Sequence, residues 1–188
     1  MELRTGESKL RLVQGDITQQ DVEAIVNAAN SRLAGGGGVD GAIHRAAGPE
    51  LHKECMEIIR RIGRLEPGNA VPTGSGRLKE RGIRWVIHTV GPIWHGGNRG
   101  EAKVLESAYR NSMRVVRELR VKSVAFPSIS TGAYGYPVDK AAEIALSTTI
   151  DELERHGKIE EVRMVLYTDS DYRAYVHVLQ DLISSLSS

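Results

Sequence analysis

The residues best suited to chemistry lie in one glycine-rich stretch, between positions 27 and 41. Asn27 and Asn30 come first, consecutive glycines occupy 35–38, and Asp40 stands in the first turn of an expected helix. Consecutive glycines cost backbone entropy, and a chain keeps them where a side chain would obstruct a turn or a ligand. A loop that enters a helix also presents free N–H groups and the positive end of the helix dipole. The stretch therefore predicts a cleft that binds a phosphate or diphosphate.

A flexible surface loop with a capping aspartate would explain the same glycines equally well. A second glycine loop, residues 130–136, favours the cleft, because it too follows an expected strand and precedes an expected helix. Asp16 ends the first expected strand, and its residue type alone favours a turn that bonds its own backbone. The other interpretation is a ligand-facing carboxylate, because open α/β sheets bind ligands at the carboxyl ends of their strands.

Two other motifs fit their surroundings poorly. Gly36, Gly38 and Gly41 match the dinucleotide fingerprint, but its first glycine should directly follow the first strand. Here a polar segment intervenes and an earlier strand is expected, so a Rossmann dehydrogenase is only the second choice, and no Walker A sequence occurs. His44, His52 and Cys55 could suggest a metal, but a structural zinc site needs four ligands. We therefore expect no metal.

The pattern of apolar residues predicts the elements that position these residues. Helices are expected at 39–47, 49–62, 101–119, 138–156 and 170–186, the last capped by Asp169 or Ser170, and strands at 9–14, 24–26, 69–73, 82–90, 121–126 and 162–167. Strands separated by helices imply a largely parallel sheet with helices on both faces. The pair 69–73 and 82–90 has no helix between, which predicts a mixed sheet, with Pro72 favouring an edge strand.

The composition excludes several classes of protein. The 188 residues fit a single domain, residues 1–188, of the three-layer α/β/α class with about six strands. The formal net charge of +1 gives no sign of a nucleic-acid or membrane surface. A single cysteine rules out an internal disulfide and suggests a reducing compartment. The N-terminus lacks the apolar core of a signal peptide, so we expect a cytoplasmic protein.

Several separated motifs, in order, resemble the macro domain family. They are VQGDIT at 13–18, IVNAAN at 25–30, GGGGVD at 35–40, VIHTVGP at 86–92 and AFPSISTG at 125–132. The chain is similar to the MacroD-type class, in which an asparagine is followed after six residues by Gly-Gly-Val-Asp. That class includes bacterial O-acetyl-ADP-ribose deacetylases. The resemblance covers essentially the whole chain and implies an α/β macro domain.

The resemblance implies a cleft for ADP-ribose. Asp16 would accept a hydrogen bond from the adenine amino group beside the backbone of Ile17, and Asn30 and Tyr134 would meet the distal ribose. Tyr167 would either face the adenine or be a core tyrosine at the end of a strand. The glycine loops would hold the diphosphate; the other implied ligand-binding residues are Asn27, Gly37, Gly38, Val39, Ser130, Thr131, Gly132, Ala133 and Gly135.

Asp40 and Asn30 are the catalytic residues that the resemblance implies. The helix dipole stabilises the Asp40 anion, yet two anions at one helix end repel each other. The conflict resolves if Asp40 points away from the phosphates, toward the distal ribose and a water that attacks a ribose-linked ester. His44, one turn later, would either support Asp40 or be simply buried and bonded.

Two classes of function follow from this site. One is a hydrolase that deacetylates O-acetyl-ADP-ribose or removes ADP-ribose from acidic side chains, with no cofactor and with mono-ADP-ribosylated proteins as possible partners. The other is a reader that binds ADP-ribose without turnover. Asp40 together with Asn30 favours the hydrolase, because a pure binding site needs no water-activating carboxylate beside the ribose. An RNA-associated regulator finds little support in a net charge of +1.

Overall fold

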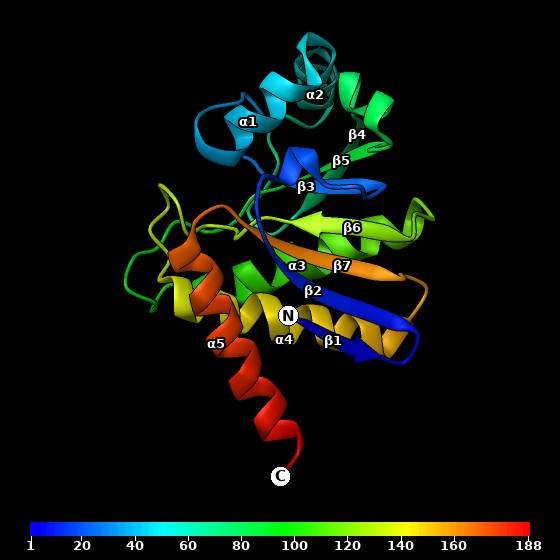
Figure 1. Cartoon of the computed structure of the whole chain (residues 1–188). Coiled ribbons are helices and arrows are strands. Elements are labelled where there is room, and N and C mark those ends of the chain that lie inside the picture. The colour runs from blue at the N-terminus through cyan, green and yellow to red at the C-terminus, as the bar shows by residue number, and fades with distance from the viewer.

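The computed structural model describes residues 1–188, which form three layers, a central sheet with helices on both faces (Figure 1). The sheet has seven strands in the order β1-β2-β7-β6-β3-β5-β4. Their bounds are Glu2–Thr5 (β1), Ser8–Gln14 (β2), Ala24–Ala28 (β3), Ala70–Gly74 (β4), Trp85–Thr89 (β5), Ser123–Phe126 (β6) and Glu161–Leu166 (β7). The inner strands are parallel, whereas the edge strands β1 and β4 are antiparallel to their neighbours. The predicted mixed α/β sheet is confirmed, with one strand more than expected.

The additional strand is β1, which forms a hairpin with β2. Thr5 pairs with Ser8 across a two-residue turn in which Gly6 has a φ of 61°. Glycine adopts this conformation without the penalty that a Cβ atom would bring. The strand has four residues and is only half-buried, so its alternation was too short to distinguish it from a disordered N-terminus.

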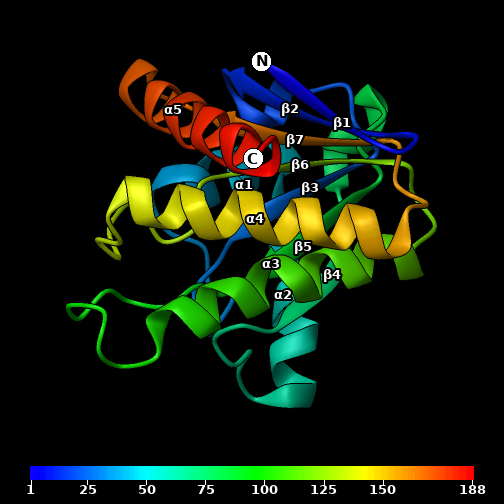
Figure 2. The same ribbon diagram turned by 90° about the horizontal axis from the view of Figure 1, so that it is seen from below.

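The helices cover both faces of the sheet (Figure 2). On one face lie α1 and α2, and on the other α3, α4 and α5; their bounds are Gly38–Ala47 (α1), Pro49–Ile62 (α2), Glu101–Glu118 (α3), Val138–His156 (α4) and Asp169–Leu186 (α5). Adjacent residues of β3 show why both faces must be covered. Val26 packs in the core beneath α3, α4 and α5, whereas Ile25 packs in the core beneath α1 and α2.

The cap of α5 differs from the prediction. The N-cap is Thr168, whose side chain accepts a hydrogen bond from the backbone N–H of Asp171. Thr168 has an extended backbone conformation, as N-cap residues require, whereas Asp169 already lies inside the helix. None of these helices is long and apolar enough to span a membrane.

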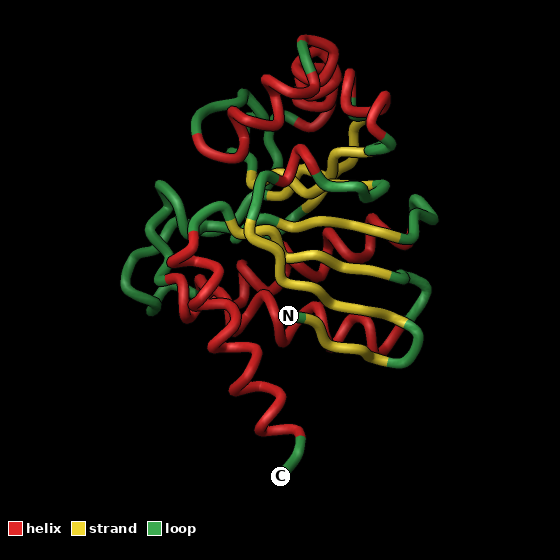
Figure 3. The backbone as a smooth tube through the Cα atoms, in the orientation of Figure 1, coloured by secondary structure: helices red, strands yellow, loops and turns green.

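Loops gather at the carboxyl ends of the parallel strands, on the left in Figure 3. Parallel strands end on the same side of a sheet, so the segments after β2, β3, β6 and β7 meet there. Because β3 and β6 are neighbours, the two glycine loops that follow them lie next to each other despite their distance in the sequence.

Candidate functional site

A cavity of about 840 Å³ opens between the two glycine loops, within the size range of small-molecule sites. Of the residues predicted from the sequence, those that line it are Asp16, Ile17, Asn30, Gly37, Gly38, Val39, Asp40, Ser130, Thr131, Gly132, Ala133, Tyr134 and Tyr167. Asn27 and Gly135 are not part of the wall. Arg45 and Asp171 also line the cavity, and no motif singled them out.

Asn30 holds the first glycine loop in shape. Its Nδ2 donates to the carbonyl oxygen of Gly35 at 2.9 Å, and its Oδ1 accepts from the N–H groups of Arg32 and Ala34, both at 3.1 Å. Helix α1 begins immediately after this loop, and no side chain caps it at Gly37. The free N–H groups at the start of α1 are therefore available to an anion.

Two kinds of constraint explain the glycines of this loop. Gly35 and Gly38 have φ values of 81° and 58°, which favour glycine. At Gly41 the reason is space, because a Cβ atom there would lie 2.5 Å from the carbonyl oxygen of Gly36. The first turn of α1 thus packs directly against the loop. By contrast, a Cβ atom at Gly37 would meet no protein atom.

Asp40 is held in the cavity wall by two side chains. It is 7% exposed, and its Oδ1 accepts a hydrogen bond of 2.8 Å from Nδ2 of Asn27. Nε2 of His44, one helical turn later, lies 3.3 Å from the same oxygen. His44 is therefore placed to support Asp40, one of the two alternatives that the sequence left open.

Asn27 takes a different place from the one predicted for it. We expected a ligand-binding residue, but its side chain is fully buried and lies behind Asp40, outside the cavity. It directly follows an apolar run, and β3 extends two residues further than expected, through Ala28. Asn27 thus belongs to the strand interior and acts on the cavity only through Asp40.

Asp16 forms the turn that its residue type favours and also lines the cavity. Its Oδ1 accepts from the backbone N–H of Thr18 at 2.8 Å and from Oγ1 of Thr18 at 2.7 Å, which caps a short 3₁₀ helix, Ile17–Gln19 (η1). The residue also lines the cavity, next to Ile17. The turn fixes one carboxylate oxygen and leaves the other for a ligand.

The aromatic residues near the cavity separate into two groups. Tyr167, which directly follows β7, is 82% exposed, so its interpretation as a core tyrosine is wrong. Tyr134 is half-buried in the second loop, and its carbonyl oxygen accepts from the N–H of Trp94 at 2.8 Å. Trp94 packs on Tyr136, with ring centroids 4.6 Å apart, rather than over the cavity.

The second glycine loop contains a strained serine. Ser130 has a φ of 70°, unusual for a residue with a side chain, and its Oγ is buried without a hydrogen-bond partner in the protein. A Cβ atom at Gly91 would lie only 2.1 Å from this oxygen, so Gly91 leaves the room that Ser130 occupies. Strained backbone and orphaned polar groups concentrate at functional sites, and this one lines the cavity.

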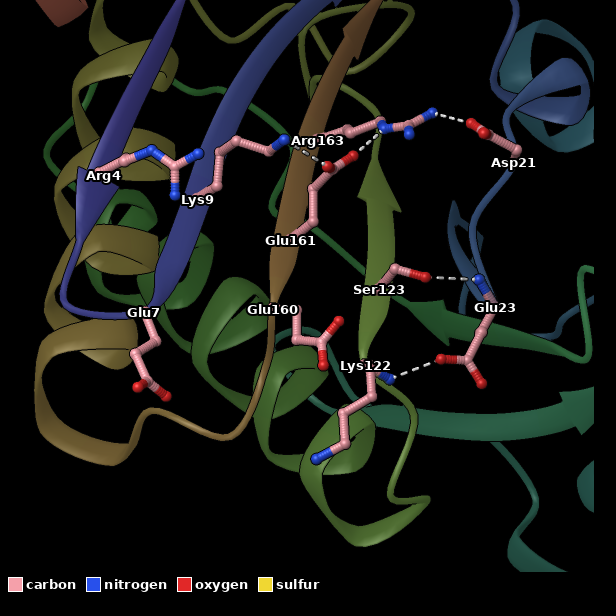
Figure 4. A pocket seen from close by; sticks show the side chains of 10 residues that line it. All are labelled: Arg4, Glu7, Lys9, Asp21, Glu23, Lys122, Ser123, Glu160, Glu161 and Arg163. Carbon is pink, nitrogen blue, oxygen red and sulfur yellow. Dashed lines mark hydrogen bonds and ion pairs between the residues drawn. The ribbon is translucent and has the colours of Figure 1, made fainter.

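A second hollow, of about 310 Å³, lies at the amino ends of the parallel strands and has no apolar lining (Figure 4). Its charges largely neutralise one another. Arg163 pairs with both Glu161 and Asp21, and Glu161 also pairs with Lys9. These contacts tie the starts of β2 and β7 to the segment before β3. We therefore interpret this hollow as an ion-pair cluster that stabilises the fold.

Comparisons with known proteins agree with this geometry. The sequence profile of the family described as Macro domain matches residues 26–145. An O-acetyl-ADP-ribose deacetylase of Salmonella newport is 51% identical over 172 residues, which cover 92% of this chain and 94% of that protein. The chain belongs to the macro domain family.

Solved structures of the family superpose closely on this one. The Oceanobacillus iheyensis macrodomain with ADP has a TM-score of 0.93 and 43% identity, covering 98% of this chain and 97% of that one. The Trypanosoma brucei macrodomain in complex with ADP-ribose has a TM-score of 0.81 and 36% identity, covering 90% and 68%. The predicted fold class is thereby confirmed, together with the resemblance on which it rested.

Proposed function

We propose that this protein binds ADP-ribose in the 840 Å³ cavity and hydrolyses the acyl ester of O-acetyl-ADP-ribose. The relative from Salmonella newport bears the name of that activity, and the Trypanosoma brucei neighbour was solved with ADP-ribose. The observation that carries the proposal is the placement of Asp40. A nearly buried carboxylate, fixed by Asn27 and His44, faces a cavity whose loops are built for an anion.

The ligand would lie across the ends of the parallel strands. Asp16, Ile17 and the exposed ring of Tyr167 would receive the adenine at the ends of β2 and β7. The diphosphate would lie between the N–H groups at the start of α1 and the backbone of the loop around Ser130. The distal ribose would then reach Asn30, Tyr134 and Asp40.

Asp40 would act on water rather than on the phosphates. Its carboxylate orients a water molecule and accepts a proton from it as the water oxygen attacks the carbonyl carbon of the ester. The bond between the acyl carbon and the ribose oxygen breaks, and the ribose oxygen takes up a proton. The products are acetate and ADP-ribose, and no cofactor is required. Removal of ADP-ribose from acidic side chains is a second candidate, because it would also place a ribose-linked ester beside Asp40.

The experiment incubates the protein with O-acetyl-ADP-ribose, and separately with a mono-ADP-ribosylated protein, and follows the release of acetate and of ADP-ribose. Calorimetry with ADP-ribose, ADP and AMP tests the binding mode, and we expect the affinity to fall in that order. Equal affinity for all three would contradict the two-loop site. Tight binding of ADP-ribose without turnover of either substrate would identify the protein as a reader.

A further inference from the structure

His88 is fully buried behind Asn27, the residue that donates to Asp40. It sits on β5, opposite Asn27 of β3 in the parallel register and opposite Val71 of the edge strand β4. Burial first, and then the neighbouring His44, lower the pKa of His88 to about 3. The imidazole is therefore neutral at physiological pH, with one nitrogen that donates a hydrogen bond and one that accepts.

The neighbours of the ring determine which nitrogen carries the hydrogen. Oγ1 of Thr73 donates its single hydrogen to the carbonyl oxygen of Gly74 at 2.8 Å. The same Oγ1 lies 2.9 Å from Nε2 of His88 and must therefore accept from it. Nε2 carries the hydrogen, and Nδ1 is left as an acceptor. The thiol of Cys55, 3.8 Å from Nε2, is a weak partner that stays protonated, because burial raises its pKa to about 12.

Nδ1 of His88 faces the amide nitrogen of Asn27 at 3.2 Å. That amide has two hydrogens, and the other one goes to Oδ1 of Asp40 at 2.8 Å. The amide oxygen of Asn27 is buried and has no hydrogen-bond partner in the protein. The orientation of the amide thus depends on its two acceptors alone. A flipped amide would turn its oxygen toward a carboxylate and a nitrogen lone pair, and both would repel it.

We propose that His88 is a positioning residue for the hydrolysis, which holds the Asn27 amide so that it always donates to Asp40. This inference rests on the proposed function. Without the acceptor at Nδ1, one of two restraints on the amide is lost, and Asp40 loses a fixed donor. If His88 only packed in the core, the turnover rate would not depend on which nitrogen of the ring accepts a hydrogen bond.

Two substitutions separate the nitrogens of the ring. In His88→Asn the side-chain oxygen takes the place of Nδ1 and still accepts from Asn27, whereas in His88→Gln the polar group reaches toward Thr73 and leaves Asn27 without an acceptor. We expect kcat within about 3-fold of wild type for His88→Asn and a fall of about 10-fold for His88→Gln, the effect of one hydrogen bond. The Kd for ADP-ribose should stay unchanged in both. Equal kcat in folded His88→Gln and wild type would overturn the proposal.

The hydroxyl of Thr73 tests the same chain of bonds without changing the ring. Thr73→Val keeps the shape but removes the acceptor of the Nε2 hydrogen, whereas Thr73→Ser keeps the hydroxyl. Proton–nitrogen NMR of the imidazole should show the hydrogen on Nε2 in wild type and in Thr73→Ser, and its partial transfer to Nδ1 in Thr73→Val, together with a reduced kcat. Cys55→Ala, which removes only the weak contact, should keep the tautomer.

The NMR measurement also covers variants of His88 that fail to fold, because it uses the wild-type protein. A hydrogen found on Nδ1 in wild type would overturn the proposal. If wild type turned over no ester of ADP-ribose, the proposed function would fail, and the tautomer would still report whether the Asn27 amide is held as inferred.

Discussion

The side chain of Asn30 closes a ring with the backbone of Gly35, through a hydrogen bond of 2.9 Å from its amide to the carbonyl oxygen. Its amide oxygen accepts two further backbone N–H groups of the same loop. The amide nitrogen and the amide oxygen of Asn30 are thus both bonded to the loop that lines the cavity. Asn30 shapes the binding surface in addition to any contact that it makes with ribose.

We expect Asn30→Ala to weaken ADP-ribose binding and to reduce turnover together. The loop loses three hydrogen bonds, each worth about 1 kcal/mol, and a change of one such bond corresponds to up to about 10-fold in affinity. Calorimetry and an acetate-release assay measure the two quantities. Ser31→Ala, in the same loop but with no hydrogen bond from its side chain, is the control. A loss of turnover at unchanged affinity would mean that Asn30 acts in the transition state alone.

Asp40→Asn should separate binding from chemistry. The amide oxygen of the new residue can still accept from Asn27, so the wall of the cavity keeps its shape. The carboxylate that takes a proton from water is lost, which typically costs about 10²–10⁴-fold in rate. We expect ADP-ribose affinity within a few-fold of wild type, because Asp40 adds no attraction for an anionic ligand. If the variant hydrolysed the ester at the wild-type rate, the catalytic role of Asp40 would be wrong.

Gly41→Ala should displace the first glycine loop from helix α1. Its Cβ would lie 2.5 Å from the carbonyl oxygen of Gly36, so the loop must move away from α1. We expect a large loss of ADP-ribose affinity with helix content retained, as measured by calorimetry and circular dichroism. The control is Ala46→Gly, which lowers the helix propensity of α1 at a residue that does not line the cavity. Equal affinities of the two variants would show that the packing of α1 against the loop does not shape the site.

Glu101 makes the stability depend on pH. Backbone N–H groups of His95, Gly97 and Arg99 donate to its carboxylate and lower its pKa from 4.5 to about 2. A carboxyl group with a lowered pKa in the folded state stabilises the fold above its unfolded pKa, and this contribution is lost as the pH falls through the folded pKa. Glu101→Gln should therefore unfold at lower urea than wild type at pH 7, and the difference should shrink between pH 4.5 and pH 2. The same difference throughout that range would contradict the assignment.

The sequence predicted most of the elements because their apolar residues recur regularly over long segments. Helix α4, Val138–His156, agrees with its predicted bounds at both ends, since its pattern is long and bounded by Pro137 and Gly157. Strand β1 was missed because four half-exposed residues carry too little pattern. The two glycine loops were found because glycine marks unusual backbone locally.

The interior of the site was harder to predict. The sequence pattern of a polar residue at the end of a strand is the same whether the residue faces a ligand or another side chain. The pattern therefore could not show that Asn27 is buried and donates to Asp40. His88 was not singled out at all, because a histidine within an apolar strand has no signal of its own. Only the parallel register of β3 and β5, which pairs Asn27 with His88, brings the two together. Such contacts depend on the strand order, which local patterns do not determine.

The strand order also determines when the cavity can exist during synthesis. Strand β2 finds its parallel partner in β7, near the opposite end of the chain, and β7 joins it to β6. Until β7 has left the ribosome, the hairpin of β1 and β2 has no place in the sheet, and such distant pairings are slow to form. Asp16 follows β2 and Tyr167 follows β7, so the end of the cavity that we propose for the adenine is assembled last. A nascent chain with a complete cavity has therefore completed its sheet.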